Sequence, residues 1–311
     1  MNQICKKTFF LLFINMLLGL SSYAQENRTL TVATYNVRYD NKGDAMQGNA
    51  WQKRVPIIRS LILFHDFDIF GTQEGLINQL QDMQKGLPAY NYIGIGREDG
   101  NKKGEFSAIF YKKEKFELLD SGHFWLAKNT GKPVKGWDAA AIRICTWGSF
   151  RELKSGFRFL FFNLHMDHVG VEARKNSAKL VLDTIKVMAG TQPVILTGDF
   201  NVDQHNESYL LINNSGILKD AYELAEIRHA TTGTFNAFHL NMKTDSRIDH
   251  IFLTKSFKVE RYGILTDTYR SPKEIFQEDA KMSEAPPEIS FREYEVRLPS
   301  DHFPVVVKVG Y

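Results

Sequence analysis

The segment VILTGDFN, residues 194–201, is an apolar run that passes directly into polar residues. A short, continuous apolar run of this kind is typical of a β-strand that is covered on both faces. Asp199 and Asn201 follow where that strand is expected to end. Near the C-terminus, SDHFPV (residues 300–305) has the reverse order, since Asp301 and His302 precede an apolar strand. Both segments place polar side chains at strand ends.

Six strand ends in the chain carry polar residues in this way. Any one of them has a simple explanation, because Asn and Asp are common turn and cap residues. Six together indicate a chemical role. These residues are Asn36 after 30–35, Glu74 after 67–73, His165 after 159–164, Asp199 with Asn201, Asp249 after 247–248, and Asp301 with His302.

The order of predicted elements favours a mixed α/β fold. Apolar residues recur at helical spacing over residues 51–64 and 170–189. Strands alternate with helices in places and follow one another in others. This predicts a layered α/β sandwich, with two packed mixed β-sheets flanked by helices. The sequence has no internal repeat and no low-complexity linker, which favours one domain over residues 27–311. The expected strands are 30–37, 68–72, 107–111, 141–146, 157–164, 194–197, 248–253 and 303–309.

The N-terminus has the pattern of a secretory signal peptide. Lys6 and Lys7 precede a short apolar run over residues 8–20, and small residues stand before Gln25. The run is too short to span a membrane comfortably. We therefore expect residues 1–24 to be removed after Ala24, with no transmembrane segment in the mature chain, and a periplasmic or extracellular location.

Composition sets limits on the function. The chain has 311 residues and a net charge of +3, which falls to +1 without residues 1–24. A near-neutral chain gives no support to binding of a long polyanion, which usually needs a basic face. The mature chain keeps one cysteine, Cys145, in a strand-like stretch, where we expect a small buried side chain and not a nucleophile.

The polar residues at the strand ends suit a hard cation. Carboxylate and amide oxygens are the ligands that such cations prefer. His165 and His302 add groups that titrate near neutral pH. No His or Cys cluster has the spacing of a zinc site, and no glycine-rich nucleotide loop is present. The oxygen ligands on offer are those of Asn36, Glu74, Asp199, Asn201 and Asp301.

Together these segments resemble the endonuclease/exonuclease/phosphatase superfamily, and in particular its nocturnin-like and deoxyribonuclease-like members. The matching stretches are TYNVR, GTQE, FFNLHMDH, LTGDFN, SRIDHIF and SDHFPV, in the family's order over residues 34–306. For the metal, the resemblance implies Mg²⁺, with Mn²⁺ as a substitute. It implies Glu74 as the principal ligand, Asn36 beside it, and Asp301 completing the metal environment.

For the chemistry, the resemblance implies that Asp199 orients or deprotonates the attacking water and that Asn201 positions the water and the phosphate. Asp249 is implied as the carboxylate partner of His302, which contacts a phosphate oxygen. His165 is implied as an aid to the leaving group. Two further residues are implied at the same site: Glu105 as a carboxylate partner of His165, and Arg143 as a phosphate ligand.

These residues predict a metal-dependent phosphoester hydrolase. We expect a phosphodiesterase acting on nucleic acid, nucleotides or a lipid headgroup, with no obligate protein partner. A phosphomonoesterase acting on inositol or sugar phosphates is the alternative, since one fold can host both activities. A member that only binds a partner is the third hypothesis, and it leaves Asp199, Asn201 and His302 unexplained.

Three further expectations concern residues near these motifs. His168 and His250 follow motif residues, and alternation along a strand would turn them away from the site. Residues 266–300 contain four prolines and little periodicity, which predicts a long loop. Because this loop ends beside Asp301, we expect it to form part of the rim of the site.

Overall fold

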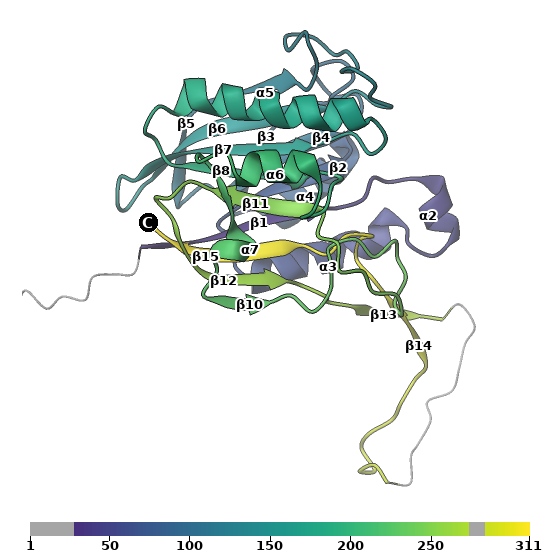
Figure 1. The fold of residues 1–311 in the computed structure, drawn as a ribbon. Coiled ribbons are helices and arrows are strands. Elements are labelled where there is room, and N and C mark those ends of the chain that lie inside the picture. The colour runs from purple at the N-terminus through teal and green to yellow at the C-terminus, as the bar shows by residue number, and fades with distance from the viewer. Residues whose placement is uncertain (1–27, 274–283) are drawn as a thin grey trace, which may run out of the picture.

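Two mixed β-sheets pack face to face in the computed structural model, which describes residues 28–273 and 284–311 (Figure 1). The first sheet has the order β10 (Ile227–His229), β12 (Lys258–Ile264), β15 (Val305–Gly310), β1 (Thr29–Asn36), β2 (Ile69–Gly75), β4 (Phe106–Lys112) and β3 (Tyr90–Ile93). The second has the order β5 (Phe116–Trp125), β6 (Ile144–Glu152), β7 (Arg158–His165), β8 (Val194–Asp199), β11 (Asp249–Leu253) and β9 (Lys219–Asp220).

Helices cover the outer faces of the sandwich, as Figure 1 shows for α5. On the first sheet lie α3 (Trp51–Phe64) and α4 (Ile77–Gly86), and on the second lie α5 (Val171–Ala189) and α6 (Glu207–Asn213). Two shorter helices are α2 (Lys42–Met46) and α7 (Ala221–Leu224). The expected layered sandwich of two mixed sheets flanked by helices is therefore confirmed.

Three apolar cores hold the layers together, because each sheet buries both of its faces. The core between the sheets includes Val32, Phe159 and Val307. A second core packs α5 against the second sheet, and a third packs α3 and α4 against the first. Cys145 is fully buried in the second core, as its sequence context predicts.

Near one end of the sandwich, the two sheets meet through polar side chains. Gln73 Nε2 donates to Asn163 Oδ1 at 2.7 Å, and Thr197 Oγ1 donates to the same oxygen at 3.0 Å. Asn163 Nδ2 in turn donates to the carbonyl oxygens of Thr72 and Ala108, both at 2.9 Å. These bonds set the relative position of β2, β7 and β8 beside the strand ends that carry the candidate site.

Each of the predicted strands and helices has an observed counterpart, but some bounds differ and several elements were not predicted. The expected strand 141–146 begins at Ile144 instead, because the backbone N–H groups of Ala140 and Ala141 donate to the Asp167 carboxylate and not to a strand. No predicted element corresponds to the strands β3, β5, β9, β10 and β12 or to the helices α2, α4, α6 and α7. The predicted signal peptide, residues 1–24, lies outside the described residues and stays a prediction.

The loop expected over residues 266–300 contains a two-stranded ribbon, β13 (Tyr269–Pro272) and β14 (Tyr294–Arg297). This ribbon points away from the sandwich in Figure 1. Ser300 is buried beside Asn36, to whose carbonyl its hydroxyl donates at 2.7 Å. None of the described residues between 266 and 300 lines the candidate site cavity, so they do not form the rim that we expected. Within residues 28–273 and 284–311, no helix is both long and apolar enough to cross a membrane.

Candidate active site

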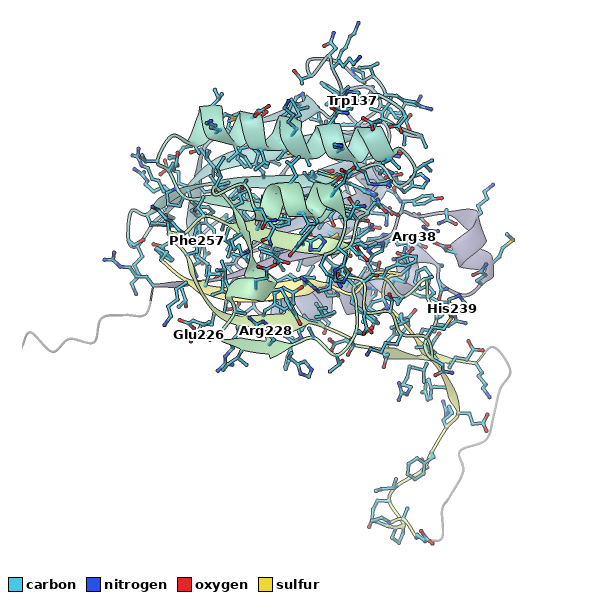
Figure 2. The ribbon with its side chains drawn as sticks, in the orientation of Figure 1. Arg38, Trp137, Glu226, Arg228, His239 and Phe257 are labelled. Atoms are coloured by element: carbon cyan, nitrogen blue, oxygen red, sulfur yellow. The ribbon has the colours of Figure 1, made fainter. Side chains whose placement is uncertain are left out.

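The strand directions bring the polar strand ends to one edge of the sandwich. β1 is parallel to β2 and β7 is parallel to β8, so Asn36, Glu74, His165 and Asp199 lie at their C-terminal ends. β11 and β15 run antiparallel to β8 and β1, so their first residues reach the same edge. In register, Asp199 is opposite His165 on one side and Asp249 on the other. This edge is the end of the sandwich where Arg38 lies, away from Phe257 (Figure 2).

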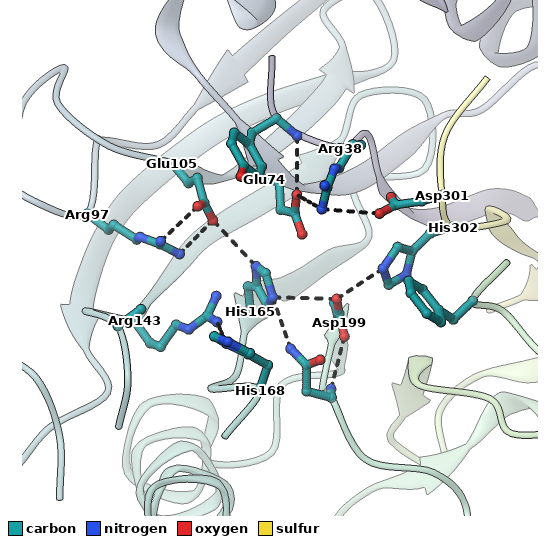
Figure 3. A pocket seen from close by; sticks show the side chains of 14 residues that line it. Arg38, Glu74, Arg97, Glu105, Arg143, His165, His168, Asp199, Asp301 and His302 are labelled. Atoms are coloured by element: carbon teal, nitrogen blue, oxygen red, sulfur yellow. Dashed lines mark hydrogen bonds and ion pairs between the residues drawn. The ribbon is translucent and has the colours of Figure 1, made fainter. Parts of the chain in front are cut away.

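A cavity of about 400 Å³ opens at this edge (Figure 3). Eight of the ten predicted site residues line it. The other two, Asn36 and Asp249, are fully buried behind the wall and contact lining residues. The lining consists of Arg38, Tyr39, Glu74, Arg97, Glu105, Ala141, Arg143, His165, His168, Asp199, Asn201, Phe235, Asp301 and His302.

A group of donors suited to a divalent cation lies on one side of this cavity. One ligand atom each from Glu74, Asp199 and His302 lie within 4.8 Å of one another. Asn36 Nδ2 donates to Glu74 Oε1 and to Asp199 Oδ2, both at 3.0 Å, and its Oδ1 accepts from the Arg38 N–H at 3.0 Å, so Asn36 orients these carboxylates. Asp301 lies nearby, linked to Glu74 through Arg38. Several carboxylates held this close repel one another, and a bound cation relieves that repulsion. The carboxylates of Glu74 and Asp199, with Asp301 nearby, therefore fit a divalent metal, whereas Asn36 offers them its amide N–H groups and orients them.

His302 is a hydrogen-bond donor in this group. Its Nδ1 lies 2.8 Å from Asp249 Oδ2, and both side chains are buried. Burial alone would lower the pKa of His302, but Asp249 and Asp199 outweigh it and raise the pKa well above the usual value. The ring is thus protonated at neutral pH, and its Nε2 points at Asp199 Oδ2, 3.7 Å away. An imidazolium placed here can stabilise negative charge on a phosphate oxygen.

Asp199 and Asn201 form a compact unit after β8. The Asn201 backbone N–H donates to Asp199 Oδ1 at 2.9 Å, and its Nδ2 lies 3.0 Å from His165 Nε2. Burial and the nearby Asp249 raise the pKa of Asp199. By contrast, burial and then Arg143 lower the pKa of His165 well below its usual value, so this ring is neutral. Asp199 and Asn201 can together bind and orient a water molecule.

Three of the lining residues have left-handed backbone. The φ angles of Arg38, Glu74 and Asn201 are 55°, 65° and 51°. Non-glycine residues adopt this region at a cost of about 1–3 kcal/mol, and such residues cluster at functional sites. Arg38 and Asn201 each stand two residues after a strand end, whereas Glu74 lies within β2 where its pairing with β4 is irregular, and all three side chains line the cavity.

Glu105 lies near His165, as the resemblance implies, but its hydrogen bonds go to an arginine. Its two carboxylate oxygens accept from Arg97 Nη1 and Nη2 at 2.6 and 2.8 Å. The nearest approach to His165 Nδ1 is 3.8 Å, too long for a hydrogen bond. Glu105 thus lies in the expected region, with Arg97 as its hydrogen-bond partner.

His168 corrects an expectation. We expected strand alternation to turn it away, yet it lines the cavity, with Nδ1 at 3.0 Å from Arg143 Nη2. The strand has already ended at His165, so alternation does not apply to residue 168. His250 does keep its structural role, since it is fully buried and contacts the Val202 carbonyl oxygen.

Five lining residues were missed from the sequence: Arg38, Tyr39, Arg97, Ala141 and Phe235. Arg38 follows Asn36 closely in TYNVR, so proximity to a motif could have indicated it. Arg97 and Phe235 stand in loops that have no recognisable pattern, and only the fold brings them to the cavity.

Comparison with known proteins agrees with this geometry. The sequence profile described as the Endonuclease/Exonuclease/phosphatase family matches residues 33–302. A solved structure of a mannosyl-6-phosphatase from Bacteroides thetaiotaomicron is 50% identical, covers 91% of this chain and 100% of its own, and superposes with a TM-score of 0.84.

Two curated relatives match over part of their length. The uncharacterized protein L388 of Acanthamoeba polyphaga mimivirus is 30% identical over 173 residues, which are 53% of this chain and 64% of the relative. Nocturnin of Drosophila melanogaster is 24% identical over 191 residues, which are 57% of this chain and 28% of the relative. The chain thus spans less than two thirds of either one. Because the family profile covers most of the chain and its motif residues meet at one cavity, the protein belongs to the endonuclease/exonuclease/phosphatase family.

Proposed function

We propose that this protein is a Mg²⁺-dependent phosphomonoesterase that removes a terminal phosphate from a sugar. The observation that carries the proposal is the unsatisfied hydrogen-bonding capacity of the Arg143 guanidinium. Its side chain is buried and lines the cavity, and its Nη1 has no hydrogen-bond partner among the described residues. A buried donor without a partner is costly, and a bound anion would satisfy it.

The other two lining arginines are already paired. Arg97 is engaged by both oxygens of Glu105. Arg38 bonds to Asp44 at 2.8 Å and lies 3.3 Å from Asp301. Arg143 contacts His168 Nδ1 through Nη2 at 3.0 Å and has one long carboxylate contact of 3.4 Å, from Nε to Asp167, which leaves its Nη1 for a ligand.

Arg143 and the metal-binding carboxylates lie on opposite sides of the cavity (Figure 3). A terminal phosphate has three non-bridging oxygens and a charge near −2, so it can be bound from both sides at once. A diester offers two such oxygens and one charge, and its second ester group needs a way out of the cavity. The arrangement therefore favours a monoester, whereas the motifs alone left diester hydrolysis as the first expectation.

The chain's own residues account for the steps. Glu74 and Asp301 would hold Mg²⁺, which when bound supplies positive charge to the phosphate oxygens, and Asn36 orients Glu74. Asp199 accepts a proton from the attacking water, while Asn201 keeps Asp199 and His165 in place. His302 donates a hydrogen bond to a phosphate oxygen, and Asp249 keeps its ring oriented and charged. As the bond from the water oxygen to phosphorus forms, the bond from phosphorus to the sugar oxygen breaks, and the sugar leaves as an alcohol that takes a proton from solvent at the open cavity.

The mannosyl-6-phosphatase of Bacteroides thetaiotaomicron supports the proposal, because half of its residues are shared over its whole length. The test is a substrate panel with Mg²⁺: mannose 6-phosphate, glucose 6-phosphate and p-nitrophenyl phosphate against bis(p-nitrophenyl) phosphate, sphingomyelin, DNA and RNA. We expect the sugar monoesters to have the highest kcat/KM. Faster hydrolysis of any diester would refute the proposal, and no turnover at all would favour the binding-only hypothesis.

Arg143→Met should lower kcat/KM for the sugar phosphates by roughly 10²-fold or more, as loss of a charged donor to a phosphate commonly does. The matched control is Arg151→Met, which removes a partly exposed arginine on β6 that pairs with Glu117 outside the cavity. Equal kcat/KM values for the two variants would leave Arg143 without the assigned role.

A further inference from the structure

Phe235 is an exposed aromatic residue at the opening of the cavity. Its exposed fraction is 42%, and it lines the cavity beside His302, with ring centroids 5.0 Å apart. It belongs to none of the three apolar cores. The walls around it are mostly charged or polar. Packing of the fold therefore does not explain an aromatic side chain in this place.

The loop that carries Phe235 is fastened to the catalytic segment. Phe235 and His302 form a β-bridge. The Phe303 N–H donates to the Thr234 carbonyl at 2.7 Å, and the Asn236 N–H donates to the Asp301 carbonyl at 2.8 Å. Thr234 Oγ1 also accepts from the backbone of Asp249 at 3.1 Å. The ring is thus exposed to solvent while its backbone is held against Asp301 and His302.

The position of Phe235 determines what it can touch. The phosphate is expected between Arg143 and the carboxylates, so the rest of the substrate extends toward the opening, where Phe235 lies. A pyranose ring has one face made largely of C–H groups, and that face can pack on the apolar face of an aromatic ring. An acyclic polyol has no such flat apolar face.

From this juxtaposition we infer that Phe235 is the platform on which the leaving group of the substrate rests, and that it selects for a pyranose ring. This inference rests on the proposed phosphomonoesterase function and adds the residue that recognises the sugar. Phe235 is a specificity-determining residue in this scheme, and it takes no part in proton transfer.

The test compares cyclic and acyclic monoesters in steady-state kinetics with Mg²⁺. In the Phe235→Ala variant, the KM for mannose 6-phosphate should rise roughly 3- to 10-fold, the range expected for losing one aromatic contact. The KM for glycerol 3-phosphate should change much less, so the preference for the ring is lost. Phe235→Tyr, which keeps the aromatic face, should restore the preference.

Leu240→Ala is the matched control, because Leu240 lies in the same loop region, is 44% exposed and does not line the cavity. It should leave both KM values unchanged. A fall in kcat of equal size on both substrates in Phe235→Ala would mean that the residue acts only by supporting His302, and the inference would be wrong.

Binding in the absence of turnover separates this inference from the proposed function. Calorimetric titration of mannose 6-phosphate and glycerol 3-phosphate into Asp199→Ala and into Asp199→Ala with Phe235→Ala measures recognition directly. Tighter binding of the cyclic ligand that disappears with Phe235 supports the platform even if the wild type hydrolyses neither compound. Equal binding of both ligands, or binding of neither, to Asp199→Ala overturns it.

Discussion

At the scale of single residues, the Asp249–His302 pair controls the charge at the centre of the site. Asp249 Oδ2 accepts from His302, while Asp249 Oδ1 is buried without a hydrogen-bond partner among the described residues. The pair is buried, so water cannot replace the carboxylate if it is lost. The charge of His302 therefore depends mainly on Asp249 and Asp199.

Asp249→Asn should lower kcat by about 10²–10⁴-fold, because the neutral amide no longer raises the pKa of His302 or fixes its orientation. The change is nearly isosteric, so the melting temperature should move by only a few degrees. Steady-state kinetics and thermal unfolding check both expectations. Asp245→Asn, at an exposed side chain in the preceding loop, is the control. A kcat within a few-fold of wild type would contradict the role of Asp249.

At the scale of elements, Arg54 joins α3 to the loops around the site. The side chain is fully buried, and its guanidinium lies over the Trp51 ring, 5.3 Å from the ring centroid. Its guanidinium donates to the Val37 and Arg38 carbonyls at 2.7 and 3.0 Å, and to the Pro299 carbonyl at 3.1 Å. One side chain thus ties the end of β1 to the segment that leads into Asp301.

Arg54→Met should lower the free energy of unfolding by about 3–5 kcal/mol, because it leaves several buried carbonyl oxygens without a donor. Guanidinium denaturation measures the loss. Lys53→Met, at the exposed neighbouring position of the same helix, should cost less than about 0.5 kcal/mol. A loss below about 1 kcal/mol in Arg54→Met would show that the loops hold their positions without it.

Gly71 packs directly against side chains of the second sheet. A Cβ added there would lie 2.2 Å from Asn163 Oδ1 and 2.5 Å from Thr197 Oγ1. Gly71→Ala should therefore destabilise the protein by roughly 1–3 kcal/mol or more through overpacking. Gly131→Ala is the control, since Gly131 is exposed and its nearest neighbour is 3.7 Å away. Equal denaturation midpoints for the two variants would disprove the close contact between the sheets.

At the scale of the whole molecule, metal binding should couple to stability. Glu74 stands at the end of β2 and Asp301 precedes β15, so a cation held by these two residues stabilises the packing at this edge of the first sheet. At a Mg²⁺ concentration 100 times Kd, the gain is about 2.7 kcal/mol, measured as a rise in melting temperature. EDTA should abolish hydrolysis and the rise together.

Glu74→Gln should lose most of the activity and of the Mg²⁺-dependent rise in melting temperature, yet remain folded, because Glu74 stands at a strand end and not in a core. Glu114→Gln, at an exposed position, should respond to Mg²⁺ as the wild type does. Hydrolysis that persists undiminished in EDTA would rule out the metal-dependent reaction.

Export is the other expectation for the whole chain. The basic residues, apolar run and small residues that precede Gln25 predict cleavage after Ala24. N-terminal sequencing of the exported protein should begin at Gln25. Recovery of the chain in a membrane fraction with Met1 retained would indicate an anchor instead.

The sequence by itself determined the elements whose signal is local. The helical spacing over residues 51–64 matches α3, and that over 170–189 matches α5 within one residue at its start. Strands such as β8 were recognisable because they are buried on both faces and therefore apolar throughout. β5 was missed because the middle of its sequence, LLDSG, is partly exposed and includes polar residues, so β5 has no continuous apolar run.

The same distinction holds for the site. Asn36, Glu74, Asp199 and His302 were predictable because each stands at the end of an apolar strand within a recognisable motif. The pairing of Glu105 with Arg97, the approach of His168 to Arg143 and the placement of Phe235 were decided by the tertiary structure alone. These side chains stand in or beside loops, where neither spacing nor hydrophobicity constrains direction. Their positions follow from contacts between segments far apart in the chain, and a local pattern carries no information about such contacts.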